Sequence, residues 1–155
     1  MIKGGGYRHP SSEETLREKV VDEYGNIRSD EQGYMQGGDV FNFVIREIPR
    51  DIKKTLEYAG DTADSFDYIV FHQANNFINA YIAKKMKLDT DKIPSTIAKY
   101  GNTSSVSVPL TIVSELKDRL YGNKKLLLSA FGVGMTWATG IVPFVDCKIS
   151  DIVEV

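Results

Sequence analysis

The 155 residues suffice for one domain with a sizeable core, and 42% hydrophobic with 26% charged residues is typical of a soluble globular protein. The formal net charge of −2 gives no general attraction to nucleic acid. The single cysteine, Cys147, excludes an internal disulfide, and the start of the chain, MIKGGGYRHP, lacks the apolar segment of a secretory signal, so we expect a cytoplasmic protein.

Residues 1–37 are mostly polar and irregular. We expect them to be an insertion or a remnant of a preceding N-terminal domain, and residues 38–155 to form the main domain. A short helix is predicted near residues 12–20, with Ser11 or Ser12 as its cap.

A long amphipathic helix is predicted between Gly38 and Gly60, where apolar residues recur at spacings of three and four. The apolar face consists of Phe41, Val44, Ile45, Ile48, Ile52 and Leu56. Pro49 lies inside this pattern and has no backbone N–H to donate. We therefore expect a kink, or a break into two helices, at this point.

Strands and helices alternate along the rest of the chain. The run FDYIVFH, residues 66–72, is rich in β-branched and aromatic residues and predicts a buried strand. Further helices are predicted at 75–88 and 104–121, and further strands at 125–130 and 136–145. This order, with an antiparallel hairpin at its end, predicts an α/β fold with a mixed sheet.

The stretch from 126 to 145 carries no charge and has the length of a membrane span. It also contains three glycines, a proline and three hydroxyl side chains. We interpret it as two buried strands joined by a glycine-rich turn, and we expect no membrane association.

Three features could carry chemistry, and each has a structural alternative. His72 ends a predicted strand, at the edge where α/β sheets collect ligands, but such a histidine can also be a packed or capping residue. Asn102 lies in GNTSS, where an asparagine can simply form a turn. The loop FGVGM, residues 131–135, has glycines that either a ligand site or a strand bend would need. The only other histidine, His9, has no metal-ligand spacing to His72, so we expect no metal site.

Three strings occur in an order that indicates a family: FHQANNFI at 71–78, YGNTSSVSVPL at 100–110 and AFGVGMTWA at 130–138. Together they resemble the C-terminal half of β-ketoacyl-acyl carrier protein synthase III, which starts bacterial fatty acid synthesis. MQGGDVFNFVI, at 35–45, resembles that family's entry into its C-terminal domain. The resemblance extends to about residue 144.

The resemblance implies the C-terminal half of a thiolase-like fold, with a mixed, mostly parallel sheet of about five strands covered by helices. The family's site combines a cysteine from the first half with a histidine and an asparagine from the second, which His72 and Asn102 match. An acyl group moves from coenzyme A to the cysteine. Malonyl-acyl carrier protein then loses carbon dioxide, and its enolate attacks the acyl thioester. Coenzyme A and phosphopantetheine thioesters are thus substrates, and no bound cofactor is expected.

The same resemblance assigns further residues to the pocket. The backbone N–H of Val133, between Gly132 and Gly134, is expected to help form an oxyanion hole, and Phe131 to form a wall. Two residues match positions near the pantetheine tunnel, and these are Asn75 and Phe41.

The chain also departs from the family. Relatives often carry a basic residue five positions after the histidine for docking acyl carrier protein, whereas this chain has Phe77. A glycine is common in place of Val133. Cys147 follows Asp146 outside any nucleophile motif, so we expect the nucleophile upstream of Met1 and no activity of the chain alone.

The resemblance implies three partners: an N-terminal half with the cysteine, acyl carrier protein and, at full length, a second copy. An alternative is a non-catalytic scaffold or partner subunit that binds an acyl or pantetheine ligand. A nucleotide-binding module fits less well because the chain has no GxGxxG or GxxxxGK motif.

Overall fold

The computed structural model describes residues 2–19, 24–132 and 134–153. It contains two compact units, Met1–Val40 and Phe41–Val155, and each is described by itself. The origin of residues 1–37 in a preceding domain or an insertion stays a prediction.

The first unit contains one short helix, α1 (Glu13–Leu16). Ser12 caps it, because its Oγ accepts from the Thr15 N–H at 3.2 Å and its own N–H donates to Thr15 Oγ1 at 2.8 Å. Ser12 was one of the two predicted caps. The helix is shorter than predicted: it has no buried residue, and Arg17 already has an extended backbone. Without tertiary packing, a helix of one turn has little to lengthen it.

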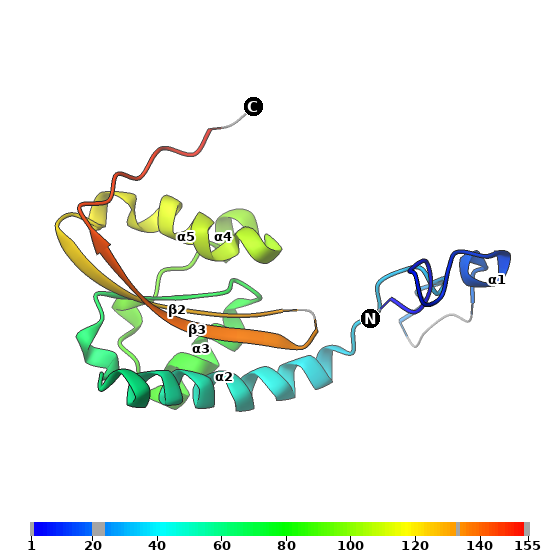
Figure 1. The fold of residues 1–155 in the computed structure, drawn as a ribbon, viewed down its shortest axis with the longest axis horizontal. Helices are drawn as coiled ribbons and strands as arrows, with labels where there is room; N and C mark the ends of the chain where they lie inside the picture. Colours follow the sequence, from blue (N-terminus) through cyan, green and yellow to red (C-terminus); the bar gives the residue numbers. More distant parts are fainter. Residues whose placement is uncertain (1, 20–23, 133, 154–155) are drawn as a thin grey trace. The chain divides into compact units, whose positions relative to one another are not determined.

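The second unit is built on a three-stranded sheet in the order β1-β2-β3 (Figure 1). β1 (Tyr68–Phe71) pairs in parallel with β2 (Asn123–Gly132), and β2 pairs antiparallel with β3 (Thr136–Val145). The predicted α/β fold with a mixed sheet and a final hairpin is confirmed. The expectation of about five mostly parallel strands is wrong for the described residues, which form one parallel and one antiparallel pair.

Helical segments precede the first strand and connect β1 to β2. They are α2 (Gly37–Ala59), η1 (Ala63–Ser65), α3 (Asn76–Met86), η2 (Thr90–Lys92), α4 (Ile97–Tyr100), η3 (Ser104–Val106), α5 (Ser107–Leu116) and η4 (Lys117–Arg119). In Figure 1, α5 lies on one side of the sheet, and α2 and α3 lie on the other. The face toward α5 contains one apolar cluster, which includes Val70, Ile112, Leu116, Leu120 and Leu126.

α2 continues through Pro49 as one helix, so the predicted break into two helices is wrong, while the alternative, a kink at Pro49, stays a prediction. Proline cannot donate to the carbonyl four residues earlier, which is that of Ile45. Lys85, on α3, supplies the missing donor: its Nζ lies 2.7 Å from the Ile45 oxygen. The helix is therefore sustained by a tertiary contact, together with the burial of Ile48, Pro49 and Ile52.

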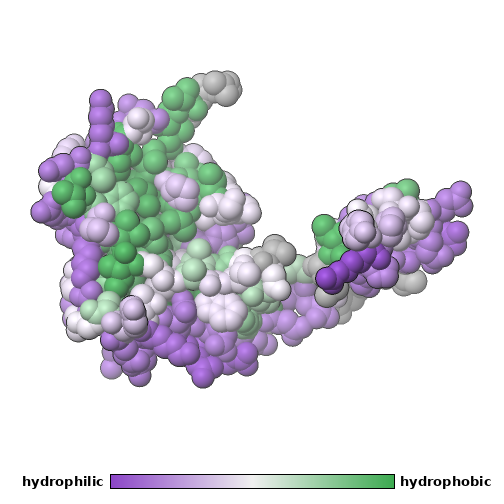
Figure 2. Space-filling view, in the orientation of Figure 1, coloured by the Kyte–Doolittle hydropathy of each residue, from purple (hydrophilic) through white to green (hydrophobic). Residues whose placement is uncertain are grey.

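The uncharged stretch forms the predicted pair of strands, but the expected burial is found only in the centre of β2. Leu126 and Leu127 are fully buried, whereas every residue of β3 is at least partly exposed, with Trp137 at 43% and Val145 at 60%. β3 is at the edge of the sheet, and Figure 2 shows an apolar area over the sheet between α5 and α2. No helix in the described ranges combines the length and the apolar character needed to cross a bilayer.

Candidate active site

His72 directly follows β1, and its backbone is held from two sides. Its N–H donates to the Ser129 carbonyl of β2 at 2.9 Å, which extends the parallel ladder by one residue. Its carbonyl accepts from Nδ2 of Asn79, on α3, at 3.2 Å. The predicted place of this histidine, at the carboxyl end of a strand and before a helix, is confirmed.

The His72 side chain is also contacted by two elements, α5 and β2. Nδ1 lies 2.6 Å from the hydroxyl of Ser107, the first residue of α5. The imidazole meets the Phe131 ring edge-on, with 5.1 Å between centroids and an interplanar angle of 84°. Burial lowers the pKa of His72 below its ordinary value of 6.5, because the charged form loses hydration. The imidazole is therefore neutral near pH 7, with Nε2 the ring nitrogen not bound to Ser107.

Behind His72 lies a buried polar network that the sequence did not reveal. Gln73 is fully buried; its Nε2 donates to the Phe71 carbonyl at 2.8 Å, and its Oε1 accepts from the Thr96 N–H at 3.1 Å. The hydroxyls of Thr96 and Thr111 are 2.9 Å apart, and that of Thr111 donates to the Ser107 carbonyl at 2.8 Å. In the sequence these residues stand out only as polar residues within otherwise apolar segments. That pattern does not show whether a polar side chain is buried or exposed.

Asn102 is exposed and lies in a turn after Gly101, whose φ is +67°. Its Oδ1 accepts from the Ser104 N–H at 2.9 Å, so the turn interpretation is confirmed. That bond also orients the amide and leaves Nδ2 available as a donor. Asn102 precedes Ser107, which contacts His72, by only five residues. The convergence of His72 and Asn102 on one substrate oxygen stays a prediction.

The structure gives the position of the predicted pocket residue Phe131 but not that of Val133. Phe131 contacts the His72 ring, whereas Val133 is outside the described residues, so its predicted N–H role has no geometry here. Gly132 ends β2, and Gly134 has a φ of +139°, a conformation that favours glycine. The strand-bend interpretation of these glycines therefore stays open.

The two predicted tunnel residues are both near α3. Asn75 caps that helix, since its Oδ1 accepts from the Ile78 N–H at 2.8 Å. Phe41 packs against Phe77 and Tyr81, with ring centroids 5.7 and 6.4 Å apart. Contact of Asn75 and Phe41 with a pantetheine chain stays a prediction.

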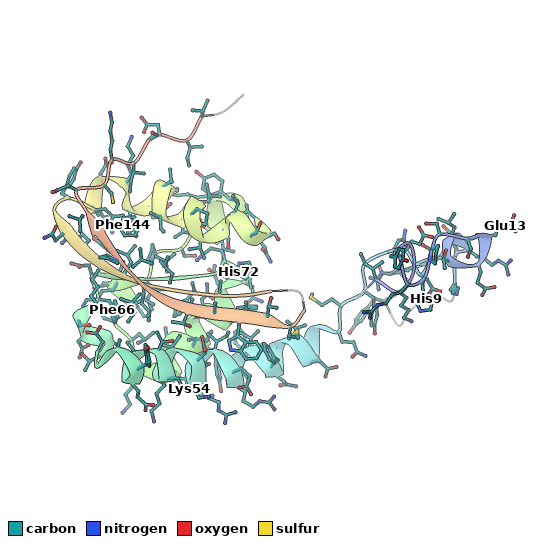
Figure 3. The ribbon with its side chains drawn as sticks, viewed as in Figure 1. His9, Glu13, Lys54, Phe66, His72 and Phe144 are labelled. Atoms are coloured by element: carbon teal, nitrogen blue, oxygen red, sulfur yellow. The ribbon has the colours of Figure 1, made fainter. Side chains whose placement is uncertain are left out.

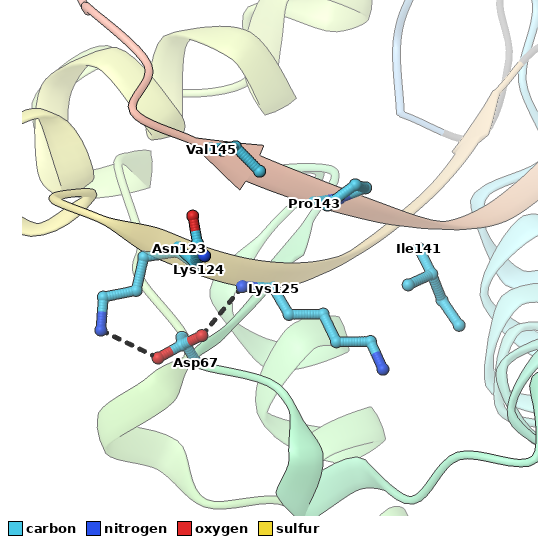
Figure 4. A pocket seen from close by; sticks show the side chains of 7 residues that line it. All are labelled: Asp67, Asn123, Lys124, Lys125, Ile141, Pro143 and Val145. Atoms are coloured by element: carbon cyan, nitrogen blue, oxygen red, sulfur yellow. Dashed lines mark hydrogen bonds and ion pairs between the residues drawn. The ribbon is translucent and has the colours of Figure 1, made fainter.

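A cavity of about 420 Å³ lies at the end of the sheet opposite to His72 (Figure 4). It is lined by Asp67, Asn123, Lys124, Lys125, Ile141, Pro143 and Val145. Asp67 accepts from Lys124 Nζ at 3.0 Å and from the Lys125 N–H at 2.8 Å, bonds that lower the pKa of its carboxyl group. Asp67 precedes β1 and His72 follows it, so this cavity is separate from the candidate site; Figure 3 shows His72 at the other end of the sheet from Phe66 and Phe144. Within the described ranges, no three His, Cys, Asp or Glu side chains are grouped as metal ligands would be.

Known proteins are similar to this chain in both sequence and fold. Residues 56–144 match the family model of the 3-oxoacyl-[acyl-carrier-protein (ACP)] synthase III C terminal. β-Ketoacyl-[acyl-carrier-protein] synthase III of Streptococcus gordonii is 44% identical over 112 residues, which are 70% of this chain and 34% of that protein. The corresponding protein of Lactococcus lactis subsp. cremoris is 37% identical over 111 residues, with the same coverage of 70% and 34%. The chain thus spans about a third of the length of these curated relatives.

Solved structures agree with the sequence matches. A 3-oxoacyl-(acyl-carrier protein) synthase from Burkholderia xenovorans is 42% identical with a TM-score of 0.76, covering 80% of this chain and 36% of that one. A second 3-oxoacyl-(acyl-carrier-protein) synthase III is 36% identical with a TM-score of 0.84, covering 95% of this chain and 43% of that one. The predicted fold, that of the C-terminal part of a thiolase-like synthase, is confirmed. The chain belongs to the 3-oxoacyl-[acyl-carrier-protein] synthase III C-terminal family.

Proposed function

We propose that this chain supplies the histidine and the asparagine of a condensing site that joins an acyl group from coenzyme A to malonyl-acyl carrier protein. The geometry of His72 carries the proposal. It is a neutral imidazole at the carboxyl end of a strand, and Nδ1 is occupied by Ser107 while Nε2 is left for a substrate. The membership of the family supports the same reaction class.

The proposed chemistry needs hydrogen-bond donors rather than charges. When a malonyl thioester loses carbon dioxide, the electrons of the broken C–C bond form an enolate, and negative charge develops on the thioester oxygen. An N–H of His72 and the Nδ2 of Asn102 would stabilise that charge. Removing one such donor typically lowers the rate by a factor of about 100 to 1,000. The enolate carbon then attacks the acyl thioester, and the cysteine thiolate leaves.

The nucleophilic cysteine of this proposal is not Cys147. Cys147 is exposed and lies two residues beyond β3, whose last residue, Val145, pairs with Asn123. His72 is bonded to Ser129, six residues further along β2, which corresponds to about 20 Å. The acyl-accepting cysteine must then come from outside these 155 residues, and the chain alone is expected to form no acyl-enzyme.

The partner in the second step is proposed to be acyl carrier protein. Phe77 occupies the position five residues after His72 and is 68% exposed. Its ring also packs against Phe41, so this position presents an aromatic ring rather than a cation. We therefore propose that carrier docking at this point depends less on ionic strength than in relatives with a basic residue there.

A chimaera tests the proposal. Residues 41–144 of this chain would replace the matching segment of the Streptococcus gordonii synthase III; the chain as a whole is 44% identical to that protein over 112 residues. We expect condensation of acetyl-coenzyme A with malonyl-acyl carrier protein, and a loss of about 100- to 1,000-fold in His72→Ala. Ser105→Ala, at an exposed position of η3, is the control. A folded chimaera that binds substrate without turnover would favour the scaffold alternative.

The chain by itself offers a second test. Incubation with radiolabelled acetyl-coenzyme A should leave it unlabelled, because Cys147 is remote from His72. Stoichiometric label that disappears in Cys147→Ala would contradict this assignment of the nucleophile.

A further inference from the structure

Ser107 has a position that neither the sequence motifs nor the proposed chemistry explains. It begins α5, is 1% exposed, and places Oγ 2.6 Å from His72 Nδ1 and 3.3 Å from the Gln73 backbone nitrogen. We propose that Ser107 is a positioning residue: its hydroxyl donates to His72 Nδ1 and so keeps the imidazole proton on Nε2. The catalytic value of that proton rests on the proposed function.

Counting donors and acceptors supports this direction of the bond. The Gln73 N–H can only donate, so Ser107 Oγ accepts there and has one hydrogen of its own left to place. If Nδ1 carried the imidazole proton, Oγ would receive two N–H donors and its hydrogen would need another acceptor. Ser107 Oγ makes no further hydrogen bond within the described ranges. Only an unprotonated Nδ1 satisfies all three groups, and buried polar groups are satisfied in the great majority of cases.

The backbone of Ser107, which carries the hydroxyl, is part of the buried polar network. The Ser107 carbonyl accepts from Thr111 Oγ1 at 2.8 Å, and Thr111 is bound in turn to Thr96 at 2.9 Å. On the other side, Phe131 packs edge-on against the imidazole. The ring therefore has little freedom to turn Nδ1 away from Ser107. Because burial also favours the neutral imidazole, the choice between its two tautomers determines which nitrogen can donate.

Nitrogen-15 NMR of the histidine ring atoms tests the proposal directly on the 155-residue chain. Above about pH 7.5, where His72 is neutral, we expect an unprotonated Nδ1 whose resonance is displaced by an accepted hydrogen bond, and a protonated Nε2. Ser107→Ala should move the Nδ1 resonance toward that of an unbonded nitrogen and raise the fraction with the proton on Nδ1. Ser105→Ala is the matched control, because Ser105 is exposed just before α5.

If His72 of the unsubstituted chain carried its proton on Nδ1, the proposal would be overturned. This part of the test needs no variant and therefore does not depend on whether Ser107→Ala folds. An Nδ1 resonance unchanged in a folded Ser107→Ala would overturn it as well. Both results are independent of turnover. An inactive chimaera would count against the proposed function alone, and a wrong tautomer against the role of Ser107 alone.

Discussion

The two proposed donors are held in opposite ways. His72 is contacted by three separate elements: Ser129 of β2 and Asn79 of α3 bind its backbone, while Ser107 of α5 and Phe131 of β2 contact its ring. Asn102 is exposed, and within the described ranges its side chain makes one hydrogen bond, to a residue two positions along the chain.

This difference indicates how each position is encoded. The place of His72 depends on the packed interior of the second unit, so a change in the interior should affect stability and His72 together. The place of Asn102 depends on a local turn, so its side chain should be replaceable without loss of stability. Substitutions that change either the packed interior or the turn, but not both, can test this contrast between His72 and Asn102.

The largest expected effect is that of Gln73→Ala. Gln73 is fully buried, and its amide bonds Phe71, Ser95 and Thr96. Truncation would leave the Thr96 N–H without an acceptor and open a cavity, so we expect the free energy of unfolding to fall by about 3 kcal/mol. Urea denaturation measures this change. Gln36→Ala, at an exposed position, is the control and should cost less than about 0.5 kcal/mol; equal losses in the two variants would contradict a special role of the buried Gln73.

Thr111→Val should have the next largest effect. The substitution keeps the shape of a fully buried side chain but removes the hydroxyl that links Thr96 to the Ser107 carbonyl. Because buried partners are left unsatisfied, we expect a loss of about 1 to 2 kcal/mol in the free energy of unfolding. Thr90→Val, at an exposed position, is the matched control for the same chemical change. A Thr111→Val protein as stable as the control would show that the network contributes no stability.

Much of this fold could be predicted because periodicity and turn residues are local signals. The strand before His72, the helix after Asn75 and the final hairpin all follow from such patterns. Of the kink or break expected at Pro49, the break is wrong; Lys85 donates to the Ile45 carbonyl that Pro49 leaves without a donor, a contact between residues 40 positions apart. Burial of β3 was also overestimated, since an apolar run does not show whether anything in the chain covers it.

The site was only partly predictable for the same reason. His72 could be placed at a strand end from the sequence, and Asn102 in a turn. The bond from Ser107 to His72 joins residues 35 positions apart, and that between Gln73 and Thr96 joins residues 23 apart. Such pairs form only when the interior is assembled, and serine and threonine side chains in a helix pattern give no sign of them.

A smaller effect should appear in the pH dependence of stability. Burial lowers the pKa of His72, so between its folded pKa and its ordinary value of 6.5 the unfolded chain binds more protons. The contribution of the neutral His72 to the free energy of unfolding is therefore complete above about pH 6.5, and it is lost as the pH falls through the folded pKa. We expect His72→Gln to flatten the fall in melting temperature just below pH 6.5. His9→Gln, in the first unit, is the control, and an unchanged pH profile in His72→Gln would contradict a desolvated imidazole.

The smallest effect on stability, and the sharpest test of the contrast, should come from Asn102→Asp. The carboxylate keeps an oxygen that can accept from the Ser104 N–H, but it removes the Nδ2 donor. Since the side chain is exposed, the free energy of unfolding should change by less than about 0.5 kcal/mol. In the chimaera the same substitution should lower malonyl decarboxylation by about 100-fold or more, because a donor to the thioester oxygen becomes an anion. A large loss of stability would instead place Asn102 among the structural residues, whereas unchanged decarboxylation would leave the turn as its only role.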